Sequence, residues 1–272
     1  MSEPLESAEP QIESSQTLPG VGLPTSLGDR VPWHALDAAR GAIWTILPLF
    51  GIALAGLLSG GAPLPKAPLS RGADIASAVS AFVLVGLGEA IFLIAPLYYS
   101  RKGLGKEATL RERLSALGLR QPEGARPWLL TLAAYVVALA LSFGYDAVVN
   151  ALKLNAHTNA DTLLATARVA PLTVMVTLAM GIIVAPFCEE IFFRGYFQPG
   201  LATALSALAA SATATVVFAV AHFDLGSFVP LLLLGSVLAF VRWRTKSVWP
   251  GLALHAANNL TAAVLILLAL RG

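Results

Sequence analysis

The amino-acid sequence predicts an all-α fold, a polytopic membrane helix bundle of about seven transmembrane helices with room for an eighth, half-inserted segment. The chain of 272 residues is 56% hydrophobic and only 12% charged, and its mean hydropathy is +0.72. A soluble domain carries about 25% charged residues, so this composition is typical of an integral membrane protein. The apolar residues stand in long runs without the alternation of barrel strands, and helices are then the only way to satisfy the backbone in lipid.

Seven apolar runs follow one another along the chain, and each one predicts a membrane helix. They cover residues 42–58, 73–99, 128–149, 171–188 and onward, 206–222, 228–241 and 248–270. Crossing a bilayer takes about 20 apolar residues, so most runs are long enough and 228–241 is short. The connector 60–71 is rich in Pro and Gly, whereas 101–126 is the one large polar loop. Within that loop we expect a short interfacial helix near residues 108–117.

The chain divides into a tail and a membrane domain. Residues 1–40 are expected to form a disordered, acidic and Pro-rich cytoplasmic tail that ends in a short interfacial segment, because they hold too little apolar surface to offset the entropy of ordering. No signal peptide is visible there, since a basic start and an apolar core are both lacking. Residues 41–272 are expected to form the membrane domain, and its catalytic part is expected at residues 171–260.

The distribution of Lys and Arg predicts the orientation in the membrane. Most of the 18 basic residues fall in or near the connectors 101–126 and 242–246, which lie on the same side as the N-terminus when seven helices cross the bilayer. Cytoplasmic loops carry an excess of Lys and Arg. We therefore expect a protein integral to the cell (inner) membrane, with a cytoplasmic N-terminus and an external C-terminus. The net charge of +2 gives no reason to expect a nucleic-acid partner.

The most informative polar cluster lies inside an apolar run at residues 188–195, where Glu189, Glu190 and Arg194 stand close together. Each ionised side chain costs a few kcal/mol at membrane depth, so charged groups there usually mark a functional site. Glu190 and Arg194 are four residues apart and can neutralise each other on one helix face. Glu189 points about 100° away and is left free for other work.

Two further clusters follow in the next apolar runs, Phe218 with His222 and His255 with Asn259. If a turn near 203–206 joins the helix of Glu189 to that of His222, both side chains lie about 22–26 Å from the turn. The third cluster lies about 12–18 Å beyond the connector that precedes it. Tilt can absorb the remaining mismatch, so we expect the carboxylate, the two imidazoles and the amide to meet in one buried cavity.

These side chains suit the hydrolysis of an amide by activated water. A carboxylate beside an imidazole can take a proton from water and pass it to a leaving amine. A neutral histidine and an asparagine amide can donate hydrogen bonds to a developing oxyanion. Two His and one Glu with an open position are also a catalytic zinc arrangement, for which Glu189, His222 and His255 are the candidates. The cofactor therefore stays open between a divalent zinc and none.

The three clusters resemble the motifs of the CPBP family, the CAAX-protease and bacteriocin-processing (Abi) intramembrane proteases. In this sequence they stand as Glu189-Glu190…Arg194, Phe218…His222 and His255…Asn259, in that order. The resemblance covers about residues 171–270 and implies an all-helical membrane endopeptidase. It assigns Glu189 as general base, His222 as its helper in activating water, and His255 and Asn259 as oxyanion stabilisers. The expected partners are the lipid bilayer and a peptide or protein substrate that enters from the membrane.

The resemblance leaves the metal requirement open, and the sequence departs from the family pattern at one position. The family is named for metalloproteases, yet its prenyl-protease members work without a directly ligated metal. Some members place an Asn four residues after the second-motif His, where this chain has Gly226, so that role is absent or moved to Asp224.

Structural readings compete at several positions. Glu190 and Arg194 fit a purely structural pair, Phe218 fits packing beneath the site, and a buried His or Asn often only joins helices. Two other intramembrane acids, Glu89 and Asp146, either pair across helices or line the cavity. The single Cys188 excludes an internal disulfide and is interpreted as a small buried residue, because an apolar wall disfavours a thiolate.

Two other functions use the same residues. Intramembrane Glu, Asp and His also form the proton relays of transporters, although no inverted repeat is visible between the two halves of the chain. The third alternative is a non-catalytic protein that acts in bacteriocin immunity or as a membrane scaffold.

Overall fold

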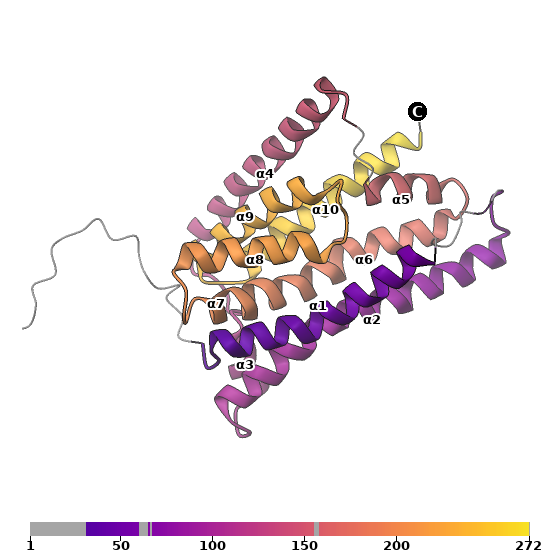
Figure 1. Ribbon diagram of the computed structural model, residues 1–272. Helices are drawn as coiled ribbons and strands as arrows, with labels where there is room; N and C mark the ends of the chain where they lie inside the picture. The colour runs from indigo at the N-terminus through magenta and orange to yellow at the C-terminus, as the bar shows by residue number, and fades with distance from the viewer. Residues whose placement is uncertain (1–30, 60–64, 66, 155–157, 272) are drawn as a thin grey trace, which may run out of the picture.

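The computed structural model describes residues 31–59, 65, 67–154 and 158–271, and these residues form helices without a β-strand (Figure 1). Most of the tail predicted at residues 1–40 lies outside the described residues, and residues 35–40 already belong to the first helix. The elements are α1 (Ala35–Leu58), α2 (Arg71–Leu104), α3 (Leu110–Ala116), α4 (Arg126–Ala151), α5 (Asn159–Ala167), α6 (Pro171–Glu190), η1 (Ile191–Phe197), α7 (Gln198–Leu201), α8 (Ala207–Ala221), α9 (Phe228–Thr245) and α10 (Trp249–Ala269).

The predicted helical membrane bundle is confirmed. Six helical segments of the described chain are long and apolar enough to cross a membrane, namely α1, α2, α4, α6 continued through α7, α9 and α10. The remaining predicted run forms α8, which has 15 residues and is shorter than the roughly 20 residues that a full span needs. The predicted interfacial helix is present as α3, whereas α5 has no counterpart among the predicted runs.

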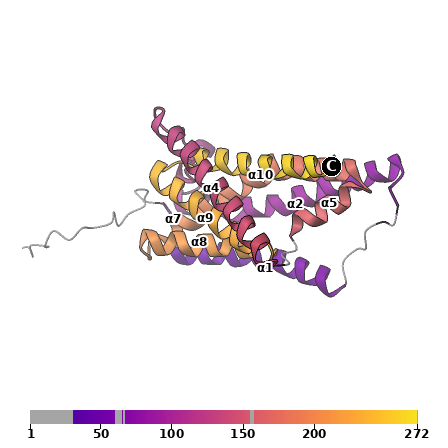
Figure 2. The same ribbon diagram turned by 90° about the horizontal axis from the view of Figure 1, so that it is seen from above.

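The helix α6 packs against both α2 and α10 and lies in the middle of the bundle (Figure 1), and Figure 2 shows α10 and α1 on opposite sides of it. Asp74 of α2 caps its first turn. The carboxylate accepts hydrogen bonds from the backbone N–H of Leu172 at 2.9 Å and from the N–H and hydroxyl of Thr173 at 3.0 and 2.9 Å. The first N–H groups of a helix have no partner within it, so Asp74 satisfies them and fixes the start of α6 against α2.

The connectors at the other end of α6 pack together through backbone contacts. The N–H of Val248, between α9 and α10, donates to the carbonyl of Gly118 at 2.9 Å, and Ser247 Oγ donates to the carbonyl of Arg120 at 2.6 Å. The turn that was expected near 203–206 follows α7, and Thr203 Oγ1 accepts from the N–H of Ala35 at 2.9 Å. The basic connectors predicted to share one side of the membrane thus lie side by side.

The segment η1 approaches the connector after α3 so closely that its glycine is required. A Cβ atom added to Gly195 would lie 2.6 Å from the carbonyl oxygen of Leu117, which is backbone and cannot move aside. We expect Gly195→Ala to destabilise the protein by about 1–3 kcal/mol, the usual cost of overpacking.

Thermal unfolding of the detergent-solubilised protein would measure this effect, with Gly144→Ala as the matched control. A Cβ at Gly144 in α4 would meet no atom within 4 Å, so the control should unfold at or slightly above the wild-type temperature. Equal unfolding temperatures for Gly195→Ala and the control would contradict the close approach.

Candidate active site

The polar cluster of the central helix lies where the α-helix changes to a π-helix. α6 ends at Glu190, and all seven residues of η1 are buried. Short π-helical segments inside α-helices occur frequently at functional sites. The predicted ion pair is present, because Arg194 Nη1 lies 3.1 Å from Glu190 Oε1 and the two side chains are only 2% and 0% exposed.

His255 of α10 joins this pair to Glu189. Its Nδ1 lies 3.2 Å from Glu190 Oε1, and its Nε2 lies 3.8 Å from Glu189 Oε2. Glu190 thus contacts a guanidinium on one side and an imidazole on the other. The sequence contained no signal for the second contact, because Glu190 already had a partner one helical turn away and His255 lies 65 residues further along the chain.

His222 reaches the same carboxylate from the end of α8. Its Nε2 lies 3.9 Å from Glu189 Oε2, and its Nδ1 lies 2.8 Å from the carbonyl oxygen of Phe218. The helix stops directly after it, because Phe223 adopts a positive φ of 50°. A bulky residue with a positive φ is uncommon and is held by its surroundings, here by the ring of Phe50 in α1 at 5.6 Å.

The ring of Phe218 packs against both imidazoles and the guanidinium. Its centroid lies 4.6 Å from the ring of His222 and 5.8 Å from that of His255, in edge-to-face arrangements. The guanidinium carbon of Arg194 lies 4.4 Å from the same centroid, within the range of a cation–π contact. Phe218 therefore holds both imidazoles and the guanidinium by packing.

The hydrogen-bond partners fix which nitrogen of each histidine carries the hydrogen. A backbone carbonyl can only accept, so Nδ1 of His222 donates to Phe218. Glu190, paired with Arg194, is an ionised acceptor, so Nδ1 of His255 donates to it. In their neutral forms both histidines then turn the lone pair of Nε2 towards Glu189.

The site consequently presents three acceptors without a donor between them. Glu189 Oε2 has no hydrogen-bond partner among the described residues, and the two Nε2 atoms lie 3.8 and 3.9 Å from it. These distances are too long for a direct hydrogen bond. They suit a small donor such as water, which can bridge polar groups separated by more than about 3.5 Å.

Asn259 lies one turn beyond His255 in α10, and its amide has a partner of its own. Its Nδ2 donates to the carbonyl oxygen of Gly181 at 2.8 Å, and Asn258 Nδ2 lies 3.5 Å from its Oδ1. Gly181 precedes Glu189 by about 12 Å of helix. The structure thus brings Glu189, His222 and His255 into mutual reach, and it holds the amide of Asn259 against α6 at Gly181, about two helical turns before Glu189.

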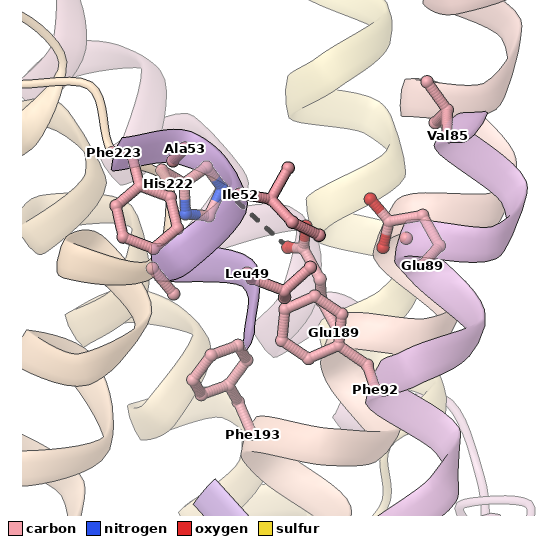
Figure 3. Close-up of a pocket in the computed structure, with 12 residues that line it drawn as sticks. Leu49, Ile52, Ala53, Val85, Glu89, Phe92, Glu189, Phe193, His222 and Phe223 are labelled. Carbon is pink, nitrogen blue, oxygen red and sulfur yellow. Dashed lines mark ion pairs between the residues drawn. The ribbon is translucent and has the colours of Figure 1, made fainter. Parts of the chain in front are cut away.

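A cavity of about 340 Å³ opens beside these residues, between α1, α2, η1 and the end of α8 (Figure 3). Its polar wall residues are Glu89, Glu189 and His222, and the rest of the lining is apolar or glycine. A mostly apolar concave site with a few convergent polar groups is the usual form of a binding pocket. Of the two other intramembrane acids, Glu89 of α2 lines this cavity, whereas Asp146 is exposed on α4.

Asp224 does not replace the asparagine that some relatives carry at the position of Gly226. Its carboxylate accepts from the N–H of Asn159 at 2.8 Å and from the N–H and hydroxyl of Ser227 at 3.1 and 2.7 Å. Burial raises the pKa of Asp224, but these hydrogen bonds outweigh it and hold the pKa below its usual range. The side chain therefore ties α5 to the loop after α8.

Cys188 is a buried thiol, as expected.

The residues as they stand do not fit a metal site. Two ligands of a tetrahedral zinc lie roughly 3.4 Å apart, given metal–ligand distances of about 2.0–2.1 Å. The Glu189–His222 and Glu189–His255 separations of 3.9 and 3.8 Å exceed that spacing. Within the described part of the chain, no group of three or more His, Cys, Asp or Glu side chains could hold a metal ion.

Comparison with known proteins identifies the region that carries the site. A family model described as Type II CAAX prenyl endopeptidase Rce1-like matches residues 171–261, from the start of α6 into α10. This match confirms the resemblance to the CPBP and CAAX-protease family that the three motifs predicted. No curated protein and no solved structure matches the chain. The matched region contains Glu189, His222, His255 and Asn259, whereas Glu89 lies outside it.

The buried pair of Glu190 and Arg194 generates a stability prediction. Removing one partner of a buried ion pair leaves the other charge uncompensated, which costs about 3–5 kcal/mol. We expect Glu190→Ala to lose that much stability, and Glu190→Ala combined with Arg194→Met to recover most of it. Unfolding of the purified protein measured as a double-mutant cycle would check this, and additive losses in the double variant would contradict the pairing.

Proposed function

We propose that this chain, whose residues 171–261 match the Rce1-like CAAX endopeptidase family, is an intramembrane endopeptidase that hydrolyses peptide bonds with water activated by Glu189 and His222. One observation carries the proposal. The carboxylate of Glu189 and the Nε2 atoms of His222 and His255 converge as acceptors at 3.8–3.9 Å beside a mostly apolar cavity. A water molecule held among them can give up a proton as it attacks a carbonyl carbon.

Glu189 and His222 are the residues placed to activate that water. Both line the cavity, and the imidazole of His222 is 27% exposed, which leaves its Nε2 accessible to a bound peptide. The proton leaves the water for Glu189 Oε2, while the hydrogen bond from Nδ1 to Phe218 keeps the Nε2 lone pair of His222 turned towards the site. A base held in this way matches the geometry that general-base catalysis requires.

His255 and Asn259 are proposed to stabilise the oxyanion, with Glu190 as the positioning residue behind His255. Since Nδ1 of His255 donates to Glu190, its Nε2 is an acceptor in the neutral ring and becomes a donor to the oxyanion once it has taken up a proton during the reaction. The amide of Asn259, which also binds the carbonyl of Gly181, is proposed as the second donor.

The substrate is proposed to be a peptide or protein segment that enters from the membrane. The lining of the cavity is mostly apolar, and three of the helices that form it, α1, α2 and α6, are long and apolar enough to cross a membrane. The basic connectors gathered at one end support a cytoplasmic N-terminus in a cell membrane. A prenylated C-terminus follows only from the family, and family analogy locates sites better than substrates.

The role of Glu189 is tested by Glu189→Gln, which keeps the shape and removes the base. We expect cleavage of quenched-fluorescence peptides, prenylated and unprenylated, to fall by about 10²–10⁴-fold in proteoliposomes. Asp146→Asn makes the same chemical change at an exposed intramembrane acid and should cleave as the wild type does. Equal activity of Glu189→Gln and wild type would remove Glu189 as the base.

The role of the cavity is tested at Gly88, which lines it. A Cβ added to Gly88 would meet no atom within 4 Å, so a larger side chain fits without displacing the helices. We expect Gly88→Leu to raise KM by filling space that the substrate needs, with little change in the unfolding temperature.

Gly72→Leu in the first turn of the same helix is the matched control, since Gly72 is equally open and is not part of the cavity lining. An unchanged KM in Gly88→Leu would show that the substrate binds elsewhere.

A further inference from the structure

A second carboxyl group faces the cavity beside Glu189, from the neighbouring helix α2 (Figure 3). Glu89 belongs to α2, outside the region matched by the family, and its side chain points into the space in front of Glu189 (Figure 3). Its Oε2 atom is buried and has no hydrogen-bond partner among the described residues. A buried polar atom without a partner costs free energy, so such an atom at a cavity wall needs an explanation.

Among the described residues that line the cavity, none is a lysine or an arginine that could compensate the charge of Glu89. α6 contributes Glu189 and the neighbouring Cys188, α8 contributes His222, and α1 contributes only apolar side chains to the cavity wall. The guanidinium of Arg194 is already held by Glu190 and by the carbonyl oxygen of Gly235 at 3.3 Å. Two carboxylates facing one apolar space repel each other, so one of them is favoured in its acid form. A carboxylic acid carries an O–H donor, which a carboxylate lacks.

We propose that Glu89 is a further catalytic residue, the acid that gives its proton to the leaving nitrogen as the peptide bond breaks. The proposal rests on the endopeptidase function proposed above. A peptide that fills the cavity would be bounded by α1, α2 and the end of α8, and it would meet the carboxyl of Glu89 on α2 as well as the water site of Glu189 and His222. The partner that Glu89 lacks within the protein is then the substrate.

The proton balance of the reaction closes with these two acids. The water proton moves to Glu189 while the water oxygen bonds to the carbonyl carbon. The C–N bond then breaks, its electron pair stays on nitrogen, and the nitrogen takes the proton from Glu89. The products are a new C-terminal carboxyl and an amine, with Glu189 protonated and Glu89 ionised. A proton that returns from Glu189 to Glu89 across the cavity restores the starting state.

The competing proton donor is Glu189 itself, which could pass on the proton that it takes from water. Substrates with different leaving groups distinguish these two proton donors in an assay. An amine leaves only after its nitrogen is protonated, whereas a phenolate leaves without help because the pKa of a phenol is about 10. The test therefore compares a peptide with a matched aryl ester of the same acyl sequence, both cleaved by the full-length protein in proteoliposomes.

We expect Glu89→Gln, which has the same shape but no transferable proton, to lower kcat/KM for the peptide by about 10²–10⁴-fold and to leave aryl-ester cleavage nearly unchanged. Glu89→Asp keeps an acid and should recover part of the peptide activity. Glu189→Gln should lose both activities, and Asp146→Asn should keep both. Unfolding temperatures of the variants verify that each one is folded.

Two results would overturn the role of Glu89 and leave the endopeptidase function standing. One is wild-type peptide activity in Glu89→Gln. The other is an equal loss of peptide and ester cleavage in Glu89→Gln, which would mean that Glu89 only shapes the cavity. Wild-type protein that cleaves neither substrate would instead overturn the endopeptidase itself, and the role of Glu89 with it.

Discussion

A buried guanidinium in an apolar bundle needs a countercharge. The ion pair that Arg194 forms with Glu190 meets this need, and the other residues of the site pack against this pair. Glu190, one turn earlier, supplies the carboxylate, and neither side chain reaches solvent. The contacts of Arg194 then involve two more elements, α8 and α9. Nη2 donates to the carbonyl of Gly235 in α9, the guanidinium lies over the ring of Phe218 in α8, and the backbone carbonyl accepts from Arg242 Nε at 2.9 Å.

The second consequence of this pair is the orientation of His255. Glu190 shares one oxygen between Arg194 and Nδ1 of the imidazole, so the charge that neutralises the guanidinium also fixes the tautomer of the histidine. The hydrogen bond from His222 to Phe218 does the same for the other imidazole. Two lone pairs therefore face Glu189, and the site is prepared for a donor that the protein itself does not supply. Glu190 therefore takes part in a structural ion pair with Arg194 and also orients the imidazole of His255.

Much of the fold was predictable because lipid leaves the backbone so few choices. Long apolar runs can only be helices in a bilayer, so each run, the turn between α7 and α8 and the interfacial helix α3 are found where they were expected, although α1 begins seven residues earlier, at Ala35. The pairing of Glu190 with Arg194 follows from a spacing of four residues on one helix. The matched depth of Glu189 and His222 follows from counting helical rise from a shared turn. Each of these arguments uses local geometry alone.

The sequence by itself thus determined the helical class, the helix order and the three polar clusters with their approximate depths. Only the tertiary structure decided which groups touch across helices: Glu190 with His255, Asn259 with Gly181, Asp224 with α5, and Glu89 with the cavity of Glu189. Such contacts depend on how each helix is rotated about its axis. That rotation is set by packing against neighbours distant in sequence, and it leaves no periodic signal in an apolar run whose faces are all alike.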